Sequence, residues 1–522
     1  MKAEVLIVGS GPTGLMLAGW LIRLGRRPLV IDKKEHANIH ETRAIGAQAR
    51  TLETYEMLGI VDRVLAQGVP TQGLDLLVNQ RRVGGIRLGE IGTGLSAYPY
   101  LFLMSQEKTE QLLREHYIEH GGQIMLQTEL VDLQQNQEGV TVQLRHADGQ
   151  RESLQVQYIC GCDGAKSTVR HALGLDFAGE TYAQRFFLAD LMGTSKSIKN
   201  TIGLWLEHNQ LHAVFPLGPG QYRVISVLPP EVAGQADPTF EEVRPQIEQF
   251  TDMQIRQVNW FTTYHIHHRV ADAFCRGRVF LLGDAGHIHS PVGAQGMNTG
   301  LMDASNLGWK LAAVLNGEAD ERLLASYEPE RIAFARLLVR TTDRIFTLMT
   351  SRSRVVQLVR NLVLSTLFTV FSWFSSVPRA FFGLISQTRI HYHDSPISRG
   401  KAGKVRGGDR LPWISWKEGG SNYDALRSLR PQLQVYGTLS PEIEAFARQH
   451  PAFPLTCFPF TPQVERAGFQ SGACYFLRPD GYVAYASPQF NQQAFQAFLR
   501  DAWGWQVHTA TALRGTEEAT RD

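Results

Sequence analysis

The sequence predicts an α/β protein in which a parallel-sheet domain carries an inserted antiparallel sheet and is followed by a C-terminal domain. The chain opens as strand, glycine-rich turn, helix and strand in "EVLIVGSGPTGLMLAGWLIRLGRRPLVID". Three short runs rich in β-branched and aromatic residues, separated by polar or Gly/Pro-rich turns, lie between residues 201 and 228. The first pattern is typical of a βαβ unit and the second of an antiparallel sheet.

The N-terminal elements follow from their apolar patterns. Residues 4–8 are almost entirely apolar, as expected of a parallel strand buried on both faces. Apolar residues then recur at helical spacing until Gly25 ends the helix, and a second strand covers residues 28–31. Further strands are predicted at residues 155–159, 201–206, 211–217, 222–228 and 278–282.

The second half of the chain is predicted to be helical first and mixed later. Helical patterns run from residue 299 to about residue 386. Within them, "LVLSTLFTVFSWFSSV" is shorter than the ~20 residues of a membrane span, so we expect a buried or interface helix, with peripheral membrane contact as the alternative. The basic, glycine-rich residues 398–412 predict a linker. Beyond it, "CYFLRPDGYVAYA" predicts a hairpin that turns at Pro479, Asp480 and Gly481.

The composition excludes several classes of protein. A net charge of +2 over 522 residues gives no electrostatic reason to expect a nucleic-acid partner. The five cysteines show neither a disulfide framework nor the paired C-x-x-C spacing of a zinc site. No segment of signal-peptide type opens the sequence, and no integral membrane segment is expected. We therefore expect a cytoplasmic protein with reduced thiols.

The opening turn carries the first chemical motif, Gly9-x-Gly11-x-x-Gly14, followed by Asp32 at the end of the second strand. The first glycine permits the tight turn, the second lets a pyrophosphate approach the backbone, and the third lets helix and strand pack closely. The helix N-terminus attracts phosphate, and the acid accepts from ribose hydroxyls. The combination predicts a dinucleotide site; a glycine-rich turn without a ligand is the structural alternative.

The second motif, "VFLLGDAGHIHSPVGAQGMNTG", separates FAD from NAD. Asp284 ends a strand, where its carboxylate can accept from a ribityl chain. The backbone amides of Gly296, Met297 and Asn298 lie where a helix begins, and such a terminus suits the negative charge that a reduced flavin gains. The segment therefore predicts a cradle for a flavin ring, and a capped helix after a loop is the alternative.

With these motifs in order, and with "CDGAKSTVR" between them, the chain resembles the class A flavoprotein monooxygenases, the aromatic hydroxylases of phenol and para-hydroxybenzoate hydroxylase type. The resemblance covers nearly the whole chain, although Ala294 stands where the family usually has glycine. "FLRPDGYVAYAS" is similar to the C-terminal thioredoxin-like domain of the phenol hydroxylase branch. Because that domain lacks a C-x-x-C pair here, the resemblance implies a structural or dimerising role, and a homodimer stays open.

The resemblance implies a Rossmann-like FAD-binding domain of para-hydroxybenzoate hydroxylase type with an inserted antiparallel-sheet substrate domain. The expected boundaries are residues 1–75, 101–175 and 275–345 for the FAD-binding domain, 76–100 and 176–274 for the substrate domain, 346–397 for a helical segment and 408–515 for the thioredoxin-like domain.

The resemblance also implies a set of FAD-binding residues. Asp163 and Gly164 are expected near the pyrophosphate and the transient NAD(P)H site, Arg43 on FAD, and Gln106 beside the ribityl chain. From the residues alone, Arg43 and Gln106 could equally be solvated helix-end residues. The full expected set is Gly9, Gly11, Pro12, Gly14, Asp32, Lys33, Arg43, Gln106, Asp163, Gly164, Gly283, Asp284, Pro291, Gly293, Gly296, Met297 and Asn298.

The implied activity is a monooxygenase that consumes NADPH or NADH and O2 and hydroxylates a phenolic or other small aromatic compound through a flavin hydroperoxide. Such chemistry requires a dry pocket. A Baeyer–Villiger oxygenase, an epoxidase and a flavin-dependent dehydrogenase or reductase share these motifs and remain alternatives. A non-enzymatic prenyl-protein escort protein is the remaining rival, but it has no use for the flavin cradle. The sequence does not reveal the catalytic base.

The substrate pocket is expected against the inserted sheet, where Phe187, Trp205, Phe215 and Tyr222 are candidates together with Pro291; ordinary sheet core is the alternative for the aromatic residues. The histidines of "YHIHHR" alternate along a strand, so we expect no metal site there. His287, in the flavin loop, is expected near the flavin and not as a base.

Overall fold

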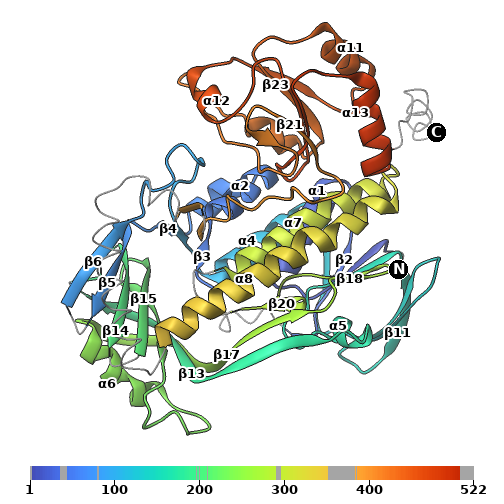
Figure 1. Cartoon of the computed structure of the whole chain (residues 1–522). Coiled ribbons are helices and arrows are strands. Elements are labelled where there is room, and N and C mark those ends of the chain that lie inside the picture. The colour runs from blue at the N-terminus through green and yellow to red at the C-terminus, as the bar shows by residue number, and fades with distance from the viewer. Residues whose placement is uncertain are drawn as a thin grey trace. The chain divides into compact units, whose positions relative to one another are not determined.

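The computed structural model describes residues 3–35, 44–78, 81–195, 197–198, 200–207, 210–289, 295–350, 382–383 and 385–505 (Figure 1). These residues form two compact units. The first comprises the described residues up to Gly19, from Arg27 to Ala304 and from Ile332 to Arg389. The second comprises Trp20 to Arg26, Ser305 to Arg331 and the described residues from Ile390 onward.

A six-stranded sheet in the first unit confirms the predicted dinucleotide-type fold. Its order is β18-β19-β12-β1-β2-β8, and all neighbours run parallel except β18 and β19. The strands are β1 (Val5–Val8), β2 (Leu29–Ile31), β8 (Gln123–Met125), β12 (Tyr158–Gly161), β18 (Cys275–Arg276) and β19 (Val279–Leu281). Every residue of β1, β2, β12 and β19 is buried, as the near-continuous apolar runs predicted.

Helices and two small sheets complete this part of the chain. The helices are α1 (Pro12–Arg23), α2 (Ala49–Leu58), α3 (Val61–Leu65), α4 (Gln106–Glu119), α5 (Thr168–Ala172), α7 (Gly296–Leu315) and α8 (Tyr327–Thr350). One small sheet joins β9 (Glu129–Gln135), β10 (Val140–Arg145) and β11 (Arg151–Val156), and the other joins β3 (Gly46–Ala47), β4 (Val69–Pro70) and β7 (Phe102–Leu103). None of the described helices has both the length and the apolar character needed to cross a bilayer. The apolar stretch at residues 362–377 lies outside the described residues.

The inserted sheet has eight strands in the order β20-β17-β13-β16-β15-β14-β5-β6. They are β5 (Gly73–Val78), β6 (Arg81–Arg87), β13 (Phe177–Thr194), β14 (Thr201–Glu207), β15 (Gln210–Gly218), β16 (Gln221–Val227), β17 (Gln254–Ala271) and β20 (His287–Ile288). The three predicted strands between residues 201 and 228 are confirmed. All pairs are antiparallel except β14 and β5, which run parallel. In Figure 1 the long strands β13 and β17 run side by side toward β20.

One face of this sheet is covered by α6 (Phe240–Phe250), which a Thr239–Glu242 capping box opens. Buried side chains of the helix and of alternating strand positions pack into one hydrophobic core. Because side chains alternate along a strand, the positions between them face the other side of the sheet. On each strand, the positions that alternate with the core positions therefore face away from α6, and these positions can line a cavity on that side of the sheet.

The second unit contains a six-stranded sheet in the order β22-β21-β26-β25-β23-β24. Its elements are β21 (Arg399–Ala402), β22 (Val405–Arg406), β23 (Gln432–Tyr436), α11 (Pro441–Gln449), β24 (Leu455–Phe458), α12 (Pro462–Arg466), β25 (Cys474–Leu477), β26 (Val483–Ser487) and α13 (Gln492–Phe498). The hairpin predicted around Pro479, Asp480 and Gly481 is confirmed as β25 and β26. The strands β23 and β24 run parallel on either side of α11 in sequence.

The predicted linker at residues 398–412 is wrong. This segment supplies β21 and β22, and β21 pairs with β26. Its glycines are required by the geometry of the sheet. A Cβ on Gly400 would collide with the Ala486 carbonyl oxygen, and Gly403 and Gly408 have φ values of 62° and 93°, which other residues rarely adopt. Glycine content alone therefore does not distinguish a flexible connection from closely packed strands.

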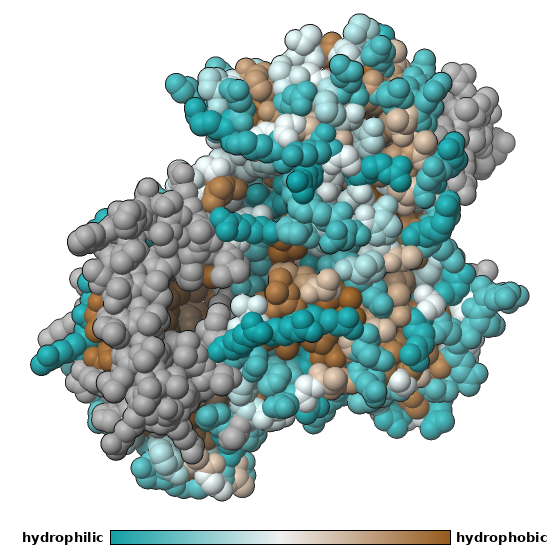
Figure 2. Space-filling view, viewed as in Figure 1, coloured by the Kyte–Doolittle hydropathy of each residue, from teal (hydrophilic) through white to brown (hydrophobic). Residues whose placement is uncertain are grey.

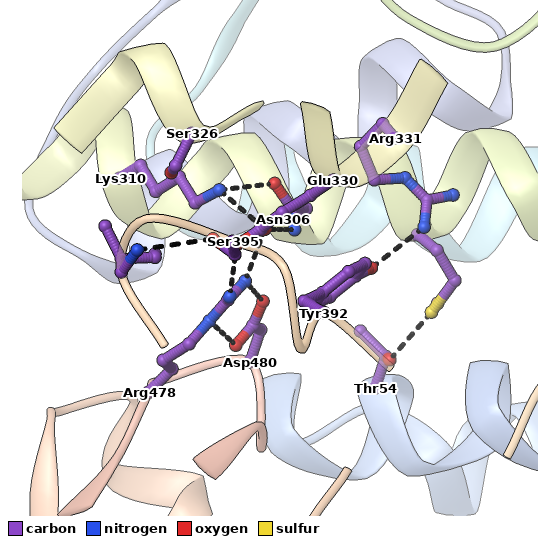
Figure 3. Close-up of polar contacts among 12 residues, drawn as sticks. Thr54, Asn306, Lys310, Ser326, Glu330, Arg331, Tyr392, Ser395, Arg478 and Asp480 are labelled. Atoms are coloured by element: carbon purple, nitrogen blue, oxygen red, sulfur yellow. Dashed lines mark hydrogen bonds and ion pairs between the residues drawn. The ribbon is translucent and has the colours of Figure 1, made fainter. Parts of the chain in front are cut away.

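A buried ionic cluster lies within the second unit (Figure 3). The Glu330 carboxylate on α8 accepts from Arg478 at 2.7 and 3.1 Å and from Lys310 at 2.8 Å. Arg478 also donates to Asp480 at 2.9 and 2.6 Å. Asn306 and Ser395 add two further hydrogen bonds to Glu330. Burial alone would raise the pKa of Glu330, but the charges of Arg478 and Lys310 outweigh it and lower that pKa to about 2.

Removing the central carboxylate should destabilise this unit. Glu330→Gln leaves Lys310 buried without its carboxylate partner, so we expect the free energy of unfolding to fall by about 3–5 kcal/mol. Urea unfolding followed by tryptophan fluorescence reports it, because Trp309 and Trp503 lie in the same unit with ring centroids 5.1 Å apart. Glu418→Gln, at an exposed position, is the control.

The same cluster predicts how the stability of the second unit changes with pH. The pKa of Glu330 is lowered in the folded state, so its stabilisation is present above the ordinary carboxyl pKa and is lost as the pH falls toward 2. The Glu330→Gln variant should lose this part of the acid dependence. An unchanged unfolding midpoint in Glu330→Gln would show that the cluster contributes no net stability.

Candidate active site

A cavity of about 1000 Å³ lies within the first unit. Its walls come from the carboxyl ends of the parallel strands, the start of α7, strands β5, β14, β15, β16 and β17 of the inserted sheet, and α8. Figure 2 shows hydrophobic residues at the surface in the region of α8, among hydrophilic ones. Leu337 of this helix is 63% exposed and also lines the cavity. Parallel strand ends and one face of an antiparallel sheet therefore open onto the same space.

The three glycines of the first motif have distinct surroundings. Gly9 has a φ of 107°, and a Cβ there would collide with the Cys162 carbonyl oxygen. A Cβ on Gly14 would collide with the carbonyl oxygen of Gly9. On Gly11, by contrast, a Cβ would meet nothing within 4 Å, and Gly11 lines the cavity together with Pro12. The turn is therefore closed on two sides by the protein and open at Gly11, which fits the approach of a pyrophosphate.

Asp32 and Lys33 line the cavity next to this turn. The Asp32 carboxylate accepts from both the backbone N–H and the hydroxyl of Ser10, each at 2.8 Å. It also accepts from the Lys34 N–H at 3.0 Å. These bonds fix the carboxylate at the carboxyl end of β2, where the acid of a dinucleotide site is expected to meet a ribose.

Asp163 follows β12 and bonds to the start of the short helix α5, whose N-cap residue is Ser167. Its Oδ2 accepts from the N–H groups of Thr168 at 2.7 Å and Val169 at 3.2 Å, whereas Oδ1 is buried with no partner among the described residues. Burial, despite these bonds, raises the pKa of the carboxyl. Asp163 and Gly164 both line the cavity, so a bound ligand with hydroxyl or ring N–H groups could satisfy the remaining oxygen.

Gln106 begins α4 and lines the cavity. Its side-chain oxygen accepts from the Ala44 N–H at 3.2 Å, and its own N–H donates to the Ala44 carbonyl at 3.0 Å. Its amide group donates to Glu110 at 2.8 Å. Gln106 therefore fixes the segment that follows Arg43, although Arg43 itself lies outside the described residues.

The second motif forms a single 3-10 turn at Gly283–Ala285, and Asp284 projects from it into the cavity. The turn is held from behind by Asp303 of α7, whose carboxylate accepts from the Gly283 N–H at 3.0 Å and contacts His287 Nε2 at 2.8 Å. His287 is buried and does not line the cavity, so its contact with Asp303 is structural. No pattern in the sequence marked Asp303, because its role depends on the contact between α7 and the 3-10 turn at Gly283–Ala285.

The start of α7 places Gly296 and Met297 on the cavity wall. Asn298 is different: its side chain is buried and bonds to Gln48 N–H at 3.0 Å, to the Thr51 hydroxyl at 2.6 Å and to the Gly46 carbonyl at 2.9 Å. Its side chain therefore holds the segment 46–51 against α7. Pro291 and Gly293 lie outside the described residues.

Of the four aromatic residues expected in the substrate pocket, Phe215 alone lines the cavity. Phe187, Trp205 and Tyr222 belong instead to the core under α6, so their assignment to the pocket is wrong. The reason is the alternation along each strand: Ile202 and Leu204 of β14 and Ile225 of β16 face the cavity, while Trp205 and Tyr222 face the helix. The sequence showed the alternation but not which face α6 covers.

Aliphatic residues make up much of the remaining wall, and no motif in the sequence marked them as lining the cavity. They are Leu74, Leu88, Leu101, Leu103, Ile266, Ile288, Leu337, Leu338 and Ile385. The α8 residues among them, with Phe334, come from a helix whose role in the pocket no motif indicated. Helical spacing could have suggested an apolar face, but not what that face meets.

Comparison with known proteins decides the family. A model of the FAD binding domain family matches residues 2–342. Rifampicin monooxygenase of Streptomyces venezuelae is 37% identical over 67% of this chain and 72% of its own length. Pentachlorophenol 4-monooxygenase of Sphingobium chlorophenolicum is 30% identical over 84% of this chain and 81% of its own. The solved anhydrotetracycline hydroxylase of Streptomyces rimosus is 28% identical, with a TM-score of 0.76 over 97% of this chain and 99% of its own.

The chain belongs to the family of FAD-dependent aromatic hydroxylases. This flavoprotein monooxygenase uses FAD, with NAD(P)H and O2 as co-substrates, and acts on aromatic compounds. The predicted FAD-binding α/β fold and the predicted hydroxylation of aromatic compounds are confirmed. The relatives do not favour the Baeyer–Villiger, epoxidase or dehydrogenase alternatives.

The histidines of the hydroxylase do not gather into a metal centre within the described part of the chain, where no three His, Cys, Asp or Glu side chains lie close enough to hold an ion. His265 and His267 both line the cavity. His267 Nδ1 lies 2.8 Å from the Thr181 hydroxyl. They therefore add polar atoms to an otherwise apolar wall.

The glycine geometry yields a paired prediction. Gly11→Val places a side chain into the open side of the turn, so the protein should fold while its dissociation constant for FAD rises at least about tenfold, or about 1.4 kcal/mol. Gly14→Ala should instead lower the stability of the apoprotein, because its Cβ collides with Gly9. Thermal unfolding of both apoproteins and titration with FAD separate the two effects. If Gly11→Val bound FAD as wild type does, the pyrophosphate would lie elsewhere.

Proposed function

We propose that this hydroxylase acts on a large, uncharged aromatic compound of fused rings, bound in the apolar part of the cavity beside FAD. The observation that carries the proposal is the distribution of charge along the wall. The charged residues of the described lining all come from segments at the ends of the parallel strands and from α4, and they are Asp32, Lys33, Lys34, Glu110, Glu129, Asp163, Lys166 and Asp284. The part formed by the inserted sheet and α8 contributes none.

The size and chemistry of the wall support a substrate of this kind. Leu204, Phe215 and Ile225 of the sheet line the same cavity as Phe334 and Leu338 of α8, and such apolar surfaces bind flat apolar molecules. A carboxylate placed there would lose its hydration at a cost, because the one buried guanidinium on this face that the described residues show beside Phe215, that of Arg223, is already paired with Asp190. Tyr264, His265 and His267 supply the polar atoms that can orient phenolic or quinone oxygens. The relatives named for rifampicin and tetracycline compounds agree with a bulky substrate.

We also propose how FAD lies. Gly11, Pro12 and Gly164 would face the pyrophosphate, Asp32 and Lys33 the adenosine ribose, and Gln106, Asp163 and Asp284 the hydroxyl-rich linking chain. The start of α7 at Gly296 and Met297 would meet the ring, and Arg43, Pro291 and Gly293 complete the proposed set. Support comes from the open side of Gly11, the unsatisfied Asp163 oxygen and the helix N-terminus.

FAD held in this position would take up electrons from NAD(P)H and pass them to O2, one atom of which would enter the substrate. The chain's own part is to hold the aromatic ring against the flavin and to exclude water. The aliphatic wall serves the second task, because water and protons would divert the oxygen chemistry to hydrogen peroxide.

For the C-terminal domain, about residues 408–515, we propose a thioredoxin-like fold with a structural or dimerising role. The order β24-β23-β25-β26, with parallel β23 and β24 and an antiparallel hairpin, supports the fold. Cys474 is buried and Cys457 exposed, and neither belongs to a C-x-x-C pair. All five cysteines of the chain are free, which supports a reducing, cytoplasmic setting. The domain boundaries given for the first unit likewise remain our proposal; β5 already begins at Gly73, ahead of the expected boundary at 76.

A matched pair of phenols tests the substrate class. We expect a neutral hydroxyanthraquinone to accelerate anaerobic reduction of the bound flavin by NAD(P)H at least about tenfold, or about 1.4 kcal/mol in the barrier. The smaller anionic 4-hydroxybenzoate should not. Stopped-flow absorbance at saturating NAD(P)H gives both rates, and product analysis shows whether oxygen enters the ring. Stronger acceleration by 4-hydroxybenzoate would contradict the proposal.

A further inference from the structure

A buried arginine on the inserted sheet reaches the FAD side of the cavity. Arg223 of β16 is 1% exposed, and its guanidinium donates twice to Asp190 of β13, at 2.7 Å from Nε and 2.6 Å from Nη2. Its Nη1 donates to the Ala44 carbonyl at 3.2 Å. Ala44 lies 179 positions away in the sequence and lines the cavity. The bidentate pair fixes the direction in which the third nitrogen points.

This arginine is one of four residues that lie opposite one another on neighbouring strands and so form a row across the sheet. Strand pairing sets Phe215 beside Arg223, Arg223 beside Asp190 and Asp190 beside Trp260. Residues opposite one another in a sheet share a face, and Phe215 lines the cavity, so the row lies on the cavity side. The Arg223 guanidinium carbon also lies 5.7 Å from the centre of the Trp260 ring. The row therefore joins the substrate wall at Phe215 to the Ala44 carbonyl.

Ala44 is held from two directions. Its carbonyl accepts from Arg223 and from the N–H of Gln106, and its N–H donates to the Gln106 side chain. The segment that Ala44 opens, residues 44–48, lines the cavity throughout. One of its two anchors thus comes from the FAD-binding domain, and the other comes from the substrate sheet.

Burying a guanidinium and a carboxylate costs desolvation free energy that an apolar pair of similar size would avoid. Contribution to stability is therefore a weak explanation for this pair. The positioning of Ala44 explains it better, because Nε and Nη2 are held by Asp190 while Nη1 donates to the Ala44 carbonyl. We infer that Arg223, oriented by Asp190, is a positioning residue for FAD: it fixes residues 44–48 at the distance from the substrate sheet at which the cofactor fits. The inference rests on the FAD placement proposed above.

The test measures FAD affinity in variants of the full-length apoprotein. Arg223→Gln and Asp190→Asn should each raise the dissociation constant for FAD about tenfold, which corresponds to about 1.4 kcal/mol. The double variant should be no weaker than Arg223→Gln, because Asp190 acts through Arg223. Arg223→Lys keeps the charge but loses the bidentate geometry, so it should also fail to restore affinity. If Arg223→Gln does not fold, the FAD affinity of Arg223→Lys tests the inference in its place.

Arg478→Gln is the matched control, since Arg478 is also fully buried and paired with carboxylates but lies in the second unit. It should lower thermal stability and leave the FAD dissociation constant within about threefold of wild type, or about 0.7 kcal/mol. The inference is overturned if Arg223→Gln and Arg223→Lys bind FAD as wild type does, if Arg478→Gln weakens FAD equally, or if the two single effects add. Wild-type FAD affinity in Gly11→Val would instead show that the proposed FAD placement is wrong.

Discussion

The close contact between Gly9 and Gly14 constrains the rest of the active site. With both of these glycines against backbone carbonyls, Gly11 is left as the open side of the β1–α1 turn, beside the carboxyl ends of β2 and β12. In the placement that we propose, a dinucleotide bound there extends along the strand ends toward Asp284 and α7. Its reactive ring would then face the inserted sheet, in agreement with a cavity whose lining comes from both sheets.

The inserted sheet therefore has two faces with different tasks. One face packs on α6 and stabilises the sheet through apolar burial. The other provides an aliphatic, water-excluding wall and carries the row from Phe215 to Trp260. Asp303, Asn298 and Arg223 belong to neither the wall nor the apolar core. Each holds a backbone segment that does line the cavity, so the shape of the cavity depends on side chains outside its lining.

Sequence reasoning succeeded where the signal is local. The strand–glycine turn–helix unit that precedes Asp32 and the hairpin at Pro479 are short motifs whose backbone conformation depends on adjacent residues. It failed where the outcome depends on distant partners. Phe187, Trp205 and Tyr222 alternate with cavity residues, but only the position of α6 decides which set is covered. Arg223 bonds to Ala44 across 179 positions of the sequence, and Arg478 bonds to Glu330 across 148 positions. No periodicity in the sequence encodes such pairs. Glycines at residues 400–408 suggested a linker because closely packed strands and flexible chains both require them.

The central claim is that FAD and the aromatic substrate share the one cavity, with the flavin ring between the start of α7 and the cavity face of the inserted sheet. A crystal structure of the enzyme with FAD and a neutral polycyclic phenol measures this directly. We predict the pyrophosphate at Gly11 and Gly164, the ring beside Met297, and the phenol against Phe215 and Ile225. A flavin ring that lies outside the cavity, or a phenol bound on the α6 side of the sheet, would contradict the account.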